Sequence, residues 1–373
     1  MKDHVPIVTG NYSPFRLVMR DGHDEWAPSL DEINDRSYDH VKLHRASTFI
    51  DIGIAPFSLV VCFDGTLALP AIDKYRDPDH ALVEFNKFLC ELLLGGTYCE
   101  AMTPDDICLG MMTFTAYCKM TGASRGARSN FHNAIRHKHV GVLDVIRLLE
   151  PETILVSELQ KAVAKGRARL VGIGSASAET LLYGTTFFAR TQWAESLIHV
   201  WTSSEQIVEA MWRDKVLSAP EIVGISNKSR AAFLRDHRTW PAATKIEMLY
   251  QKGLLVPDQT YALLNTARKA RNNFVHSGAM PSRPEVEAAL DGLFQMAALR
   301  INNHSDRSAL EEIGNLVKAR GRVYAEWDRR GKPLEGVTHW LSIPAIPGDP
   351  GWEDAPYEII EELQLKPIRG KGV

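Results

Sequence analysis

The sequence lacks the features that mark secreted, membrane-spanning or disulfide-stapled proteins. Its five cysteines are odd in number and include no C-x-x-C pair, which argues against a complete disulfide framework and against a zinc knuckle. The N-terminus, MKDHVPIVTG, has no charged-then-apolar signal pattern. The most apolar run, FIDIGIAPFSLVVCF, is interrupted by Asp51 and Pro56 and is too short to cross a bilayer. We therefore expect a soluble, cytoplasmic protein with buried, reduced cysteines.

An excess of one charge is also missing, because the formal net charge is only −3. Any site for a polyanion must then be a local patch rather than a property of the whole molecule. The sequence contains no low-complexity tract and no internal repeat, and 45% of its residues are hydrophobic, as in ordinary globular proteins. A chain of 373 residues is long enough for two domains.

Residues 1–172 mix strand and helix patterns, which predicts an N-terminal α+β domain. The stretch FSLVVCFDGTLALPAI predicts two strands around a turn at Asp64-Gly65. Three further stretches predict helices: DPDHALVEFNKFLCELLLGG, TPDDICLGMMTFTAYCKM with a start at Thr103-Pro104, and ETILVSELQKAVAKG. The stretch LVGIGSAS, 170–177, predicts a loop between domains.

Residues 175–305 read as one helix after another. Apolar residues recur at intervals of three and four, for example at Trp193, Leu197, Val200 and Trp201. Helices with short connections predict an antiparallel helical bundle. Residues 306–373 predict one more helix and an irregular tail rich in proline, glycine and tryptophan. The expected fold class is mainly α, with a C-terminal bundle and an N-terminal α+β domain.

The stretch ARKARNNFVHSGAM, 267–280, carries most of the chemistry. It belongs to a predicted helix that begins at Pro257-Asp258 and ends at Gly278, and no acidic residue lies between Asp258 and Glu285. On a helical wheel, Asn272 and His276 lie on one face, away from the apolar stripe and with Arg271 at its edge. The stripe consists of Leu263, Ala267, Ala270 and Phe274. We therefore expect His276 to face solvent, a groove or a partner chain.

These residues resemble the signature of HEPN domains, a helical-bundle family found in many prokaryotic RNases of toxin and phage-defence systems. The signature is an Arg, a polar residue and a His after four to six positions, matched here by Arg271, Asn272 and His276. The likeness covers about residues 180–305, and its order of helices resembles the Apea-like HEPN branch. The spacing alone is not diagnostic, because Arg16–His23, Arg125–His132 and Arg230–His237 also satisfy it.

The resemblance implies a metal-independent endoribonuclease with no cofactor, whose products carry 2′,3′-cyclic phosphate ends. His276 would act as base or acid, Arg271 would bind the phosphate, and Asn272 would orient His276 or donate to the phosphate. In the family two bundles pair, which implies a homodimer with a composite site. Besides RNA, the implied partners are an antitoxin, a phage-derived trigger or another regulatory protein. Glu205 is either a residue that orients Arg271 or a solvated helix acid.

Basic residues near and far from this stretch are candidates for RNA contact. Arg268 and Lys269 adjoin the signature. The segment RGARSNFHNAIRHKH, 125–139, is either an RNA-gripping surface or a solvated basic helix face, and its candidate RNA-binding residues are Arg125, Arg128, Arg136 and Lys138. Its histidines, His132, His137 and His139, match no standard metal spacing.

Other interpretations remain open. The segment CFDGT, 62–66, is similar to the D-x-D-G-T motif of haloacid-dehalogenase-type phosphatases, but Cys62 replaces the nucleophilic aspartate, which favours a simple hairpin turn. For the whole chain, the alternatives to a nuclease are a non-catalytic HEPN module that binds nucleotide or a partner protein, and an adaptor that docks onto RNA.

Overall fold

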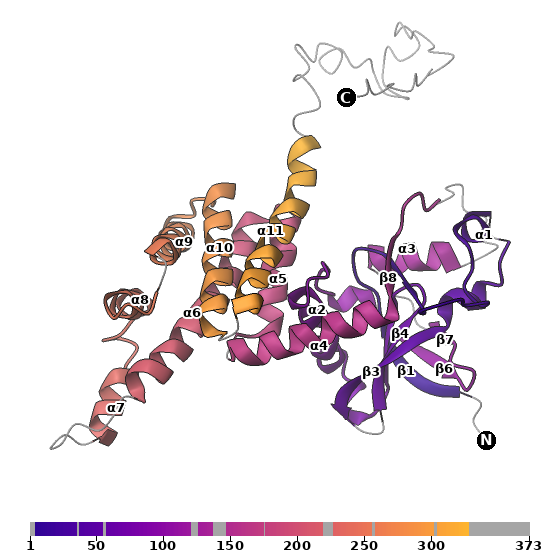
Figure 1. The fold of residues 1–373 in the computed structure, drawn as a ribbon, viewed down its shortest axis with the longest axis horizontal. Helices are drawn as coiled ribbons and strands as arrows, with labels where there is room; N and C mark the ends of the chain where they lie inside the picture. The colour runs from indigo at the N-terminus through magenta and orange to yellow at the C-terminus, as the bar shows by residue number, and fades with distance from the viewer. Residues whose placement is uncertain are drawn as a thin grey trace, which may run out of the picture. The chain divides into compact units, whose positions relative to one another are not determined.

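The computed structural model describes residues 4–35, 37–54, 57–120, 126–136, 147–174, 176–218, 227–255, 258–301 and 304–327. In these ranges the chain forms eight strands and eleven α-helices, and all strands precede residue 156 (Figure 1). The expectation of a mainly helical protein with a strand-containing N-terminal part is confirmed. The irregular tail that we predicted for the C-terminus lies outside the described residues.

A six-stranded antiparallel sheet organises the N-terminal part, in the order β3-β4-β5-β1-β6-β7. The strands are β1 (His4–Gly10), β3 (Ala46–Ile54), β4 (Phe57–Cys62), β5 (Leu67–Pro70), β6 (Ile107–Thr113) and β7 (Cys118–Met120). A separate parallel pair joins β2 (Arg16–Met19) to β8 (Glu152–Leu155), so that Arg16 lies opposite Glu152. This pairing brings two segments that are distant in the sequence side by side.

The predicted hairpin at Asp64-Gly65 is confirmed, since β4 and β5 pair on either side of it. Gly65 has a φ of +82°, which favours glycine there, and the Asp64 carboxylate accepts a hydrogen bond from the backbone N–H of Thr66 at 3.2 Å. The prediction of a helix from Thr103 is wrong. Thr103 and Asp106 do form a capping box, but only a short 3-10 turn follows before the chain extends into β6.

Most of the remaining helices follow the predicted segments, but the helix predicted for ETILVSELQKAVAKG begins only at Val156, because Glu152–Leu155 forms β8. The helices are α1 (Leu30–Asp35), α2 (Pro78–Leu94), α3 (Ala127–Arg136), α4 (Val156–Ile173), α5 (Ala178–Ala189), α6 (Trp193–Trp212), α7 (Asn227–Arg235), α8 (Ala242–Gln251), α9 (Asp258–Ser277), α10 (Arg283–Arg300) and α11 (His304–Trp327). The predicted loop at 170–177 is partly helical, because α4 continues to Ile173 and only then ends at Gly174.

The sheet and the helices share a main hydrophobic core, and three smaller buried clusters lie outside it. A single cluster of buried side chains extends from Val8 in β1 to Val317 in α11, and residues 1–324 form one compact unit. The boundary that we predicted near residue 172 coincides with the end of α4, whereas the boundary at 305 falls inside α11. The contacts within this unit therefore do not separate the two domains that we predicted.

Helix α4 approaches α2 so closely that side chains do not fit between them. A Cβ added at Gly166 of α4 would lie 1.6 Å from the carbonyl oxygen of Glu91, and one added at Gly95 would lie 2.0 Å from that of Ala162. Both positions therefore require glycine. The contact fixes α4 against the C-terminal end of α2.

A buried polar cluster holds α3 against the β4–β5 turn. Asp64 is 1% exposed; it accepts a hydrogen bond from the Nε group of Arg136 and forms an ion pair with the Nη2 group of that residue, which is also 1% exposed. The Nδ1 atom of His132 lies 3.2 Å from the same carboxylate, and Arg136 also donates to the hydroxyl of Thr66. Two segments that appeared unrelated in the sequence, CFDGT and the basic stretch 125–139, thus contact each other.

Burial and the neighbouring charges shift the pKa values of Asp64 and His132 in opposite directions. Burial raises the pKa of the Asp64 carboxyl, but the charge of Arg136 and the hydrogen bond from His132 outweigh it and hold that pKa well below its usual range. Burial lowers the pKa of His132 and exceeds the opposing effect of Asp64. The cluster at neutral pH therefore consists of an aspartate–arginine ion pair and a neutral imidazole whose Nδ1–H faces the aspartate.

We expect Asp64→Asn to lower the free energy of unfolding by about 3–5 kcal/mol, because it leaves the Arg136 guanidinium buried without a charge partner. Chemical denaturation followed by circular dichroism measures this change. The control is Asp73→Asn, whose carboxylate is 99% exposed and which we expect to have an effect within about 0.5 kcal/mol. Equal effects of the two substitutions would contradict the role of the buried pair.

The cluster also predicts a pH dependence of stability. The lowered pKa of His132 means that below pH 6.5 the unfolded chain binds a proton that the folded chain does not, so acid favours unfolding. Protonation of His132 in the unfolded chain lowers the free energy of unfolding by at most about 1.4 kcal/mol per pH unit. Protonation of Asp64 in the unfolded chain lowers it further below about pH 4.

Thermal unfolding at pH 7.5, 6.5 and 5.5 tests this dependence by comparing the wild type with His132→Gln. We expect a smaller decrease of the midpoint in the variant, and no change in slope for His80→Gln, whose imidazole is exposed. Parallel curves for the wild type and His132→Gln would refute the assignment.

Candidate functional site

Helix α9 has the boundaries and the buried face that the sequence led us to expect. It spans Asp258–Ser277 and ends before Gly278, whose φ is +71° and whose N–H donates to the Phe274 carbonyl at 2.9 Å. Ala267 and Ala270 are buried as predicted, whereas Leu263 and Phe274 of the predicted stripe are only half-buried. Thr260 and Leu264 complete the buried face instead. Helix α9 packs mainly against α10, and it also contacts α6 and α8. The opposite side of the helix is left open.

The signature residues lie on or near this open side. His276 is exposed in the last turn, as predicted, and Arg271 and Asn272 are half-buried. The Nη1 group of Arg271 donates to the Oδ1 atom of Asn272 at 3.3 Å. The side-chain oxygen of Asn272 is therefore engaged by Arg271, which leaves its amide N–H groups directed elsewhere.

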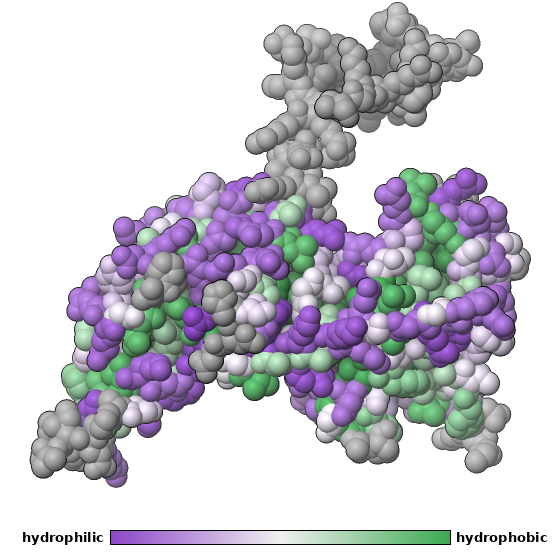
Figure 2. Space-filling model, in the orientation of Figure 1, coloured by the Kyte–Doolittle hydropathy of each residue, from purple (hydrophilic) through white to green (hydrophobic). Residues whose placement is uncertain are grey.

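Two more cations extend the positive charge toward the middle of α9. Lys269 is exposed and Arg268 is half-buried, with its Nε donating to Asn265 at 3.4 Å. No carboxylate on this helix follows Asp258 to offset these charges. In Figure 2 the surface over α9 and α10 is largely hydrophilic in the orientation shown. The C-terminal half of α9 thus presents a cationic surface suited to a phosphate.

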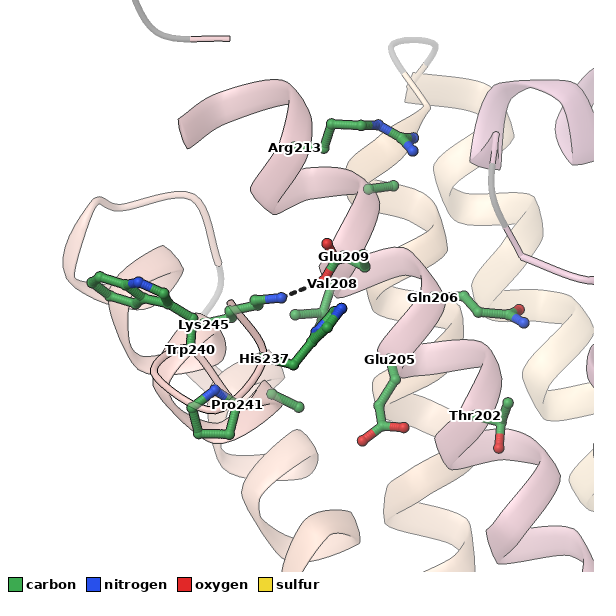
Figure 3. A pocket seen from close by; sticks show the side chains of 12 residues that line it. Thr202, Glu205, Gln206, Val208, Glu209, Arg213, His237, Trp240, Pro241 and Lys245 are labelled. Carbon is green, nitrogen blue, oxygen red and sulfur yellow. Dashed lines mark hydrogen bonds and ion pairs between the residues drawn. The ribbon is translucent and has the colours of Figure 1, made fainter. Parts of the chain in front are cut away.

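Glu205 does not accompany the signature residues. It lines a cavity of about 490 Å³ between α6 and the segment that joins α7 to α8, and its carboxylate lies on the α6 wall (Figure 3). Within the described ranges, no hydrogen bond or ion pair joins Glu205 to Arg271. The expected role of Glu205 in orienting Arg271 therefore receives no support from this arrangement.

The cavity beside Glu205 combines charged and aromatic walls. Lys245 is 2% exposed, and its ammonium donates to Glu209 across the cavity (Figure 3). The Trp240 ring forms another wall, and His237 approaches from the same loop. His237 belongs to the Arg230–His237 match that we set aside as uninformative. No signal in the sequence pointed to this cavity, because its walls come from segments that are separate in the sequence.

The basic stretch 125–139 is not the open surface that we expected. Arg136 is buried in the pair with Asp64, and the Arg128 side chain is 10% exposed and bonded to Glu100, Asp106 and Ser13. Both arginines form ion pairs with acidic residues of the protein itself. The prediction that Arg128 and Arg136 bind RNA is therefore wrong. The interpretation as a solvated basic face is equally wrong for these two residues. Arg125 and Lys138 lie outside the described residues.

The structure also describes the cysteines, the apolar character of the helices and the grouping of residues that can bind metal. All five cysteines are free and buried. No helix in the described ranges has the length and apolar character needed to cross a membrane. Among the same residues, no three His, Cys, Asp or Glu side chains are grouped so that they would hold a metal ion.

Comparison with known proteins identifies no relative of this chain. No protein-family model, no curated protein and no solved structure matches the chain. The functional argument therefore depends on the residues of α9 and their surroundings.

Proposed function

We propose that the protein is a metal-independent endoribonuclease of a phage-defence or toxin-like system, with an HEPN-like site formed where two copies meet. The observation that carries the proposal is the grouping of Arg271, Asn272 and His276 on the open side of α9, beside two further cations and free of nearby acids on the helix. The resemblance of this segment to the HEPN signature supports the same assignment.

These side chains match the needs of RNA cleavage by internal transesterification. A base removes the proton of the ribose 2′-hydroxyl, the 2′-oxygen attacks the adjacent phosphorus, and the bond to the 5′-oxygen breaks as that oxygen receives a proton. Histidine titrates near neutral pH and serves as base or acid, while an arginine stays charged and stabilises the negative charge that develops on the phosphate. The products are a 2′,3′-cyclic phosphate and a free 5′-hydroxyl.

A single histidine does not readily perform both proton transfers at the same time, which favours a site shared by two subunits. Apolar side chains near His276 support such an interface. Val275 is 48% exposed and Met280 is 69% exposed, and both flank the signature histidine in the sequence. Burial of these side chains against a second copy would remove apolar surface from water and place two His276 residues near each other.

The open position of the signature residues also suits a non-catalytic function. A helix surface that carries the exposed Lys269 beside the half-buried Arg268 and Arg271 is typical of docking onto RNA or a phosphorylated partner. This adaptor function is the alternative to the nuclease. Cleavage measured directly separates the two.

Arg271→Ala and His276→Ala are each expected to lower RNA cleavage at least about 100-fold, because each removes a group that acts in the transition state. The measurement uses the full chain, total RNA and EDTA, with analysis of product ends for 2′,3′-cyclic phosphate. The control variants are Arg76→Ala and His80→Ala, which remove exposed side chains of the same types elsewhere. Full activity of His276→Ala would place the chemistry outside α9, and inactivity of every protein with intact RNA binding would favour the adaptor.

Val275→Glu is expected to weaken self-association at least about tenfold, because a charge would replace apolar surface at the proposed interface. Analytical ultracentrifugation over a range of concentrations measures the change. Val171→Glu is the matched control, since Val171 is 74% exposed on α4, away from α9. A monomeric wild type, or equal association of both variants, would overturn the shared site.

A further inference from the structure

A second site is suggested by a cavity far from the signature residues in the sequence. Its volume is about 590 Å³, and its walls come from the β2–β8 pair, the segment after α2, α4 and α11. A neighbouring hollow of about 350 Å³ shares Gly95, Gly96, Lys165 and Leu316 with it, so the two lie next to each other. Small-molecule sites have volumes of this order.

Positive charge predominates on the walls of the larger cavity. Four cationic side chains line it, Arg16, Lys161, Lys165 and Arg320, against two carboxylates, Glu152 and Glu158, which leaves an excess of two positive charges. The closeness of α4 to α2, which requires Gly95 and Gly166, positions Lys161 and Lys165 of α4 beside the segment that follows α2.

The two carboxylates are already engaged. Glu152 accepts from the Nη2 group of Arg16 at 2.5 Å and from that of Arg320 at 2.6 Å, so one negative charge is shared by two guanidinium groups. Glu158 accepts from the backbone N–H of Leu155 at 3.1 Å and caps the first turn of α4. Glu152 is therefore committed to the two arginines, and among the described residues no ion pair joins Glu152 or Glu158 to Lys161 or Lys165.

Lys161 and Lys165 lie one turn apart on α4, and both are exposed. In the part of the chain that the structure describes, neither ammonium group forms an ion pair, whereas Arg169 on the next turn is paired with Asp306. Hydrogen bonds from the hydroxyl and the backbone N–H of Ser157 lower the pKa of the Asp21 carboxyl, and the charge of Lys161 helps to lower it. That carboxylate forms no ion pair with Lys161 in the described residues. Like charges at this spacing repel each other and weaken a helix unless an anion lies between them.

We propose that this cavity binds a small phosphorylated molecule, up to the size of a nucleotide. Lysine ammonium groups act as flexible point charges for phosphate, and the guanidinium groups of Arg16 and Arg320 add fixed donors behind them. The hydroxyl groups of Thr97 and Thr153, which line the same cavity, supply neutral donors. The proposal is independent of the nuclease assignment, because no residue of α9 takes part.

Isothermal titration of the full-length protein with ATP, with pyrophosphate and with adenosine tests the proposal. We expect saturable binding of ATP, of pyrophosphate or of both, and none of adenosine, which has no phosphate. Binding of ATP alone would show that the nucleoside is recognised as well, and binding of pyrophosphate alone would show that the phosphates suffice. Absence of saturable binding by both phosphorylated probes would overturn the proposal.

The double variant Lys161→Gln/Lys165→Gln is expected to weaken this binding at least tenfold. Both side chains are exposed, so the variant should fold, and an unchanged thermal midpoint without ligand verifies this. The control Lys87→Gln/Lys252→Gln removes two lysines outside the cavity and should bind as the wild type does. Equal loss in both double variants would indicate non-specific attraction and reject the cavity.

A short single-stranded RNA supplies the remaining arm of the test. If that RNA binds through Lys161 and Lys165 while ATP and pyrophosphate do not, the surface belongs to a nucleic-acid interface and the small-molecule assignment is wrong.

Discussion

The close contact between α2 and α4 is the constraint on which the rest of the structure depends. Because Gly95 and Gly166 lack side chains, the two backbones touch, and α4 joins a core that already contains the sheet. A larger residue at either position would push α4 away and open the core to water. The same contact brings the cationic side of α4 next to the β2–β8 pair and to α11, which together enclose the cavity that we assign to a phosphorylated ligand.

Much of the helical architecture was predictable because its signals are local. Asp77 caps α2, Gly278 terminates α9, and a capping box at Ser282 and Glu285 starts α10. Each signal involves residues within one turn of the helix end, so no tertiary knowledge is required. The prediction of a helix at Thr103 was wrong because a contact distant in the sequence outweighs the local signal. Its cap is real, but pairing with β1 along seven residues of β6 outweighs a local preference for helix.

The polar cluster around Asp64 was not predictable from the sequence. Asp64 and His132 are 68 residues apart, and each lies in a segment that we interpreted separately, one as a turn and the other as a basic surface. Only the docking of α3 onto the turn reveals that Arg136 neutralises Asp64. The error concerning Arg128 and Arg136 has the same origin, since a helical wheel shows which residues share a face and does not show what covers that face. The grouping of Arg271, Asn272 and His276 was easier to predict, because all three residues belong to the single helix α9.

The two proposed sites are connected by continuous packing. Arg320 of α11 lines the cavity, and the same helix is tied to α10 by Lys318, whose ammonium lies 2.7 Å from the carboxylate of Asp291. Helix α10 in turn contacts α9 where the hydroxyl of Thr260 donates to Gln295 at 2.9 Å.

Continuity alone does not amount to regulation, which requires an element with two arrangements that both sites bias. The shared carboxylate of Glu152 is the natural candidate for such an element. It holds Arg16 and Arg320 together, and an anion in the cavity competes with it for both guanidinium groups. A ligand that drew Arg320 away from Glu152 would act directly on α11, whereas one bound by the lysines alone would leave the contact between Arg320 and Glu152 intact.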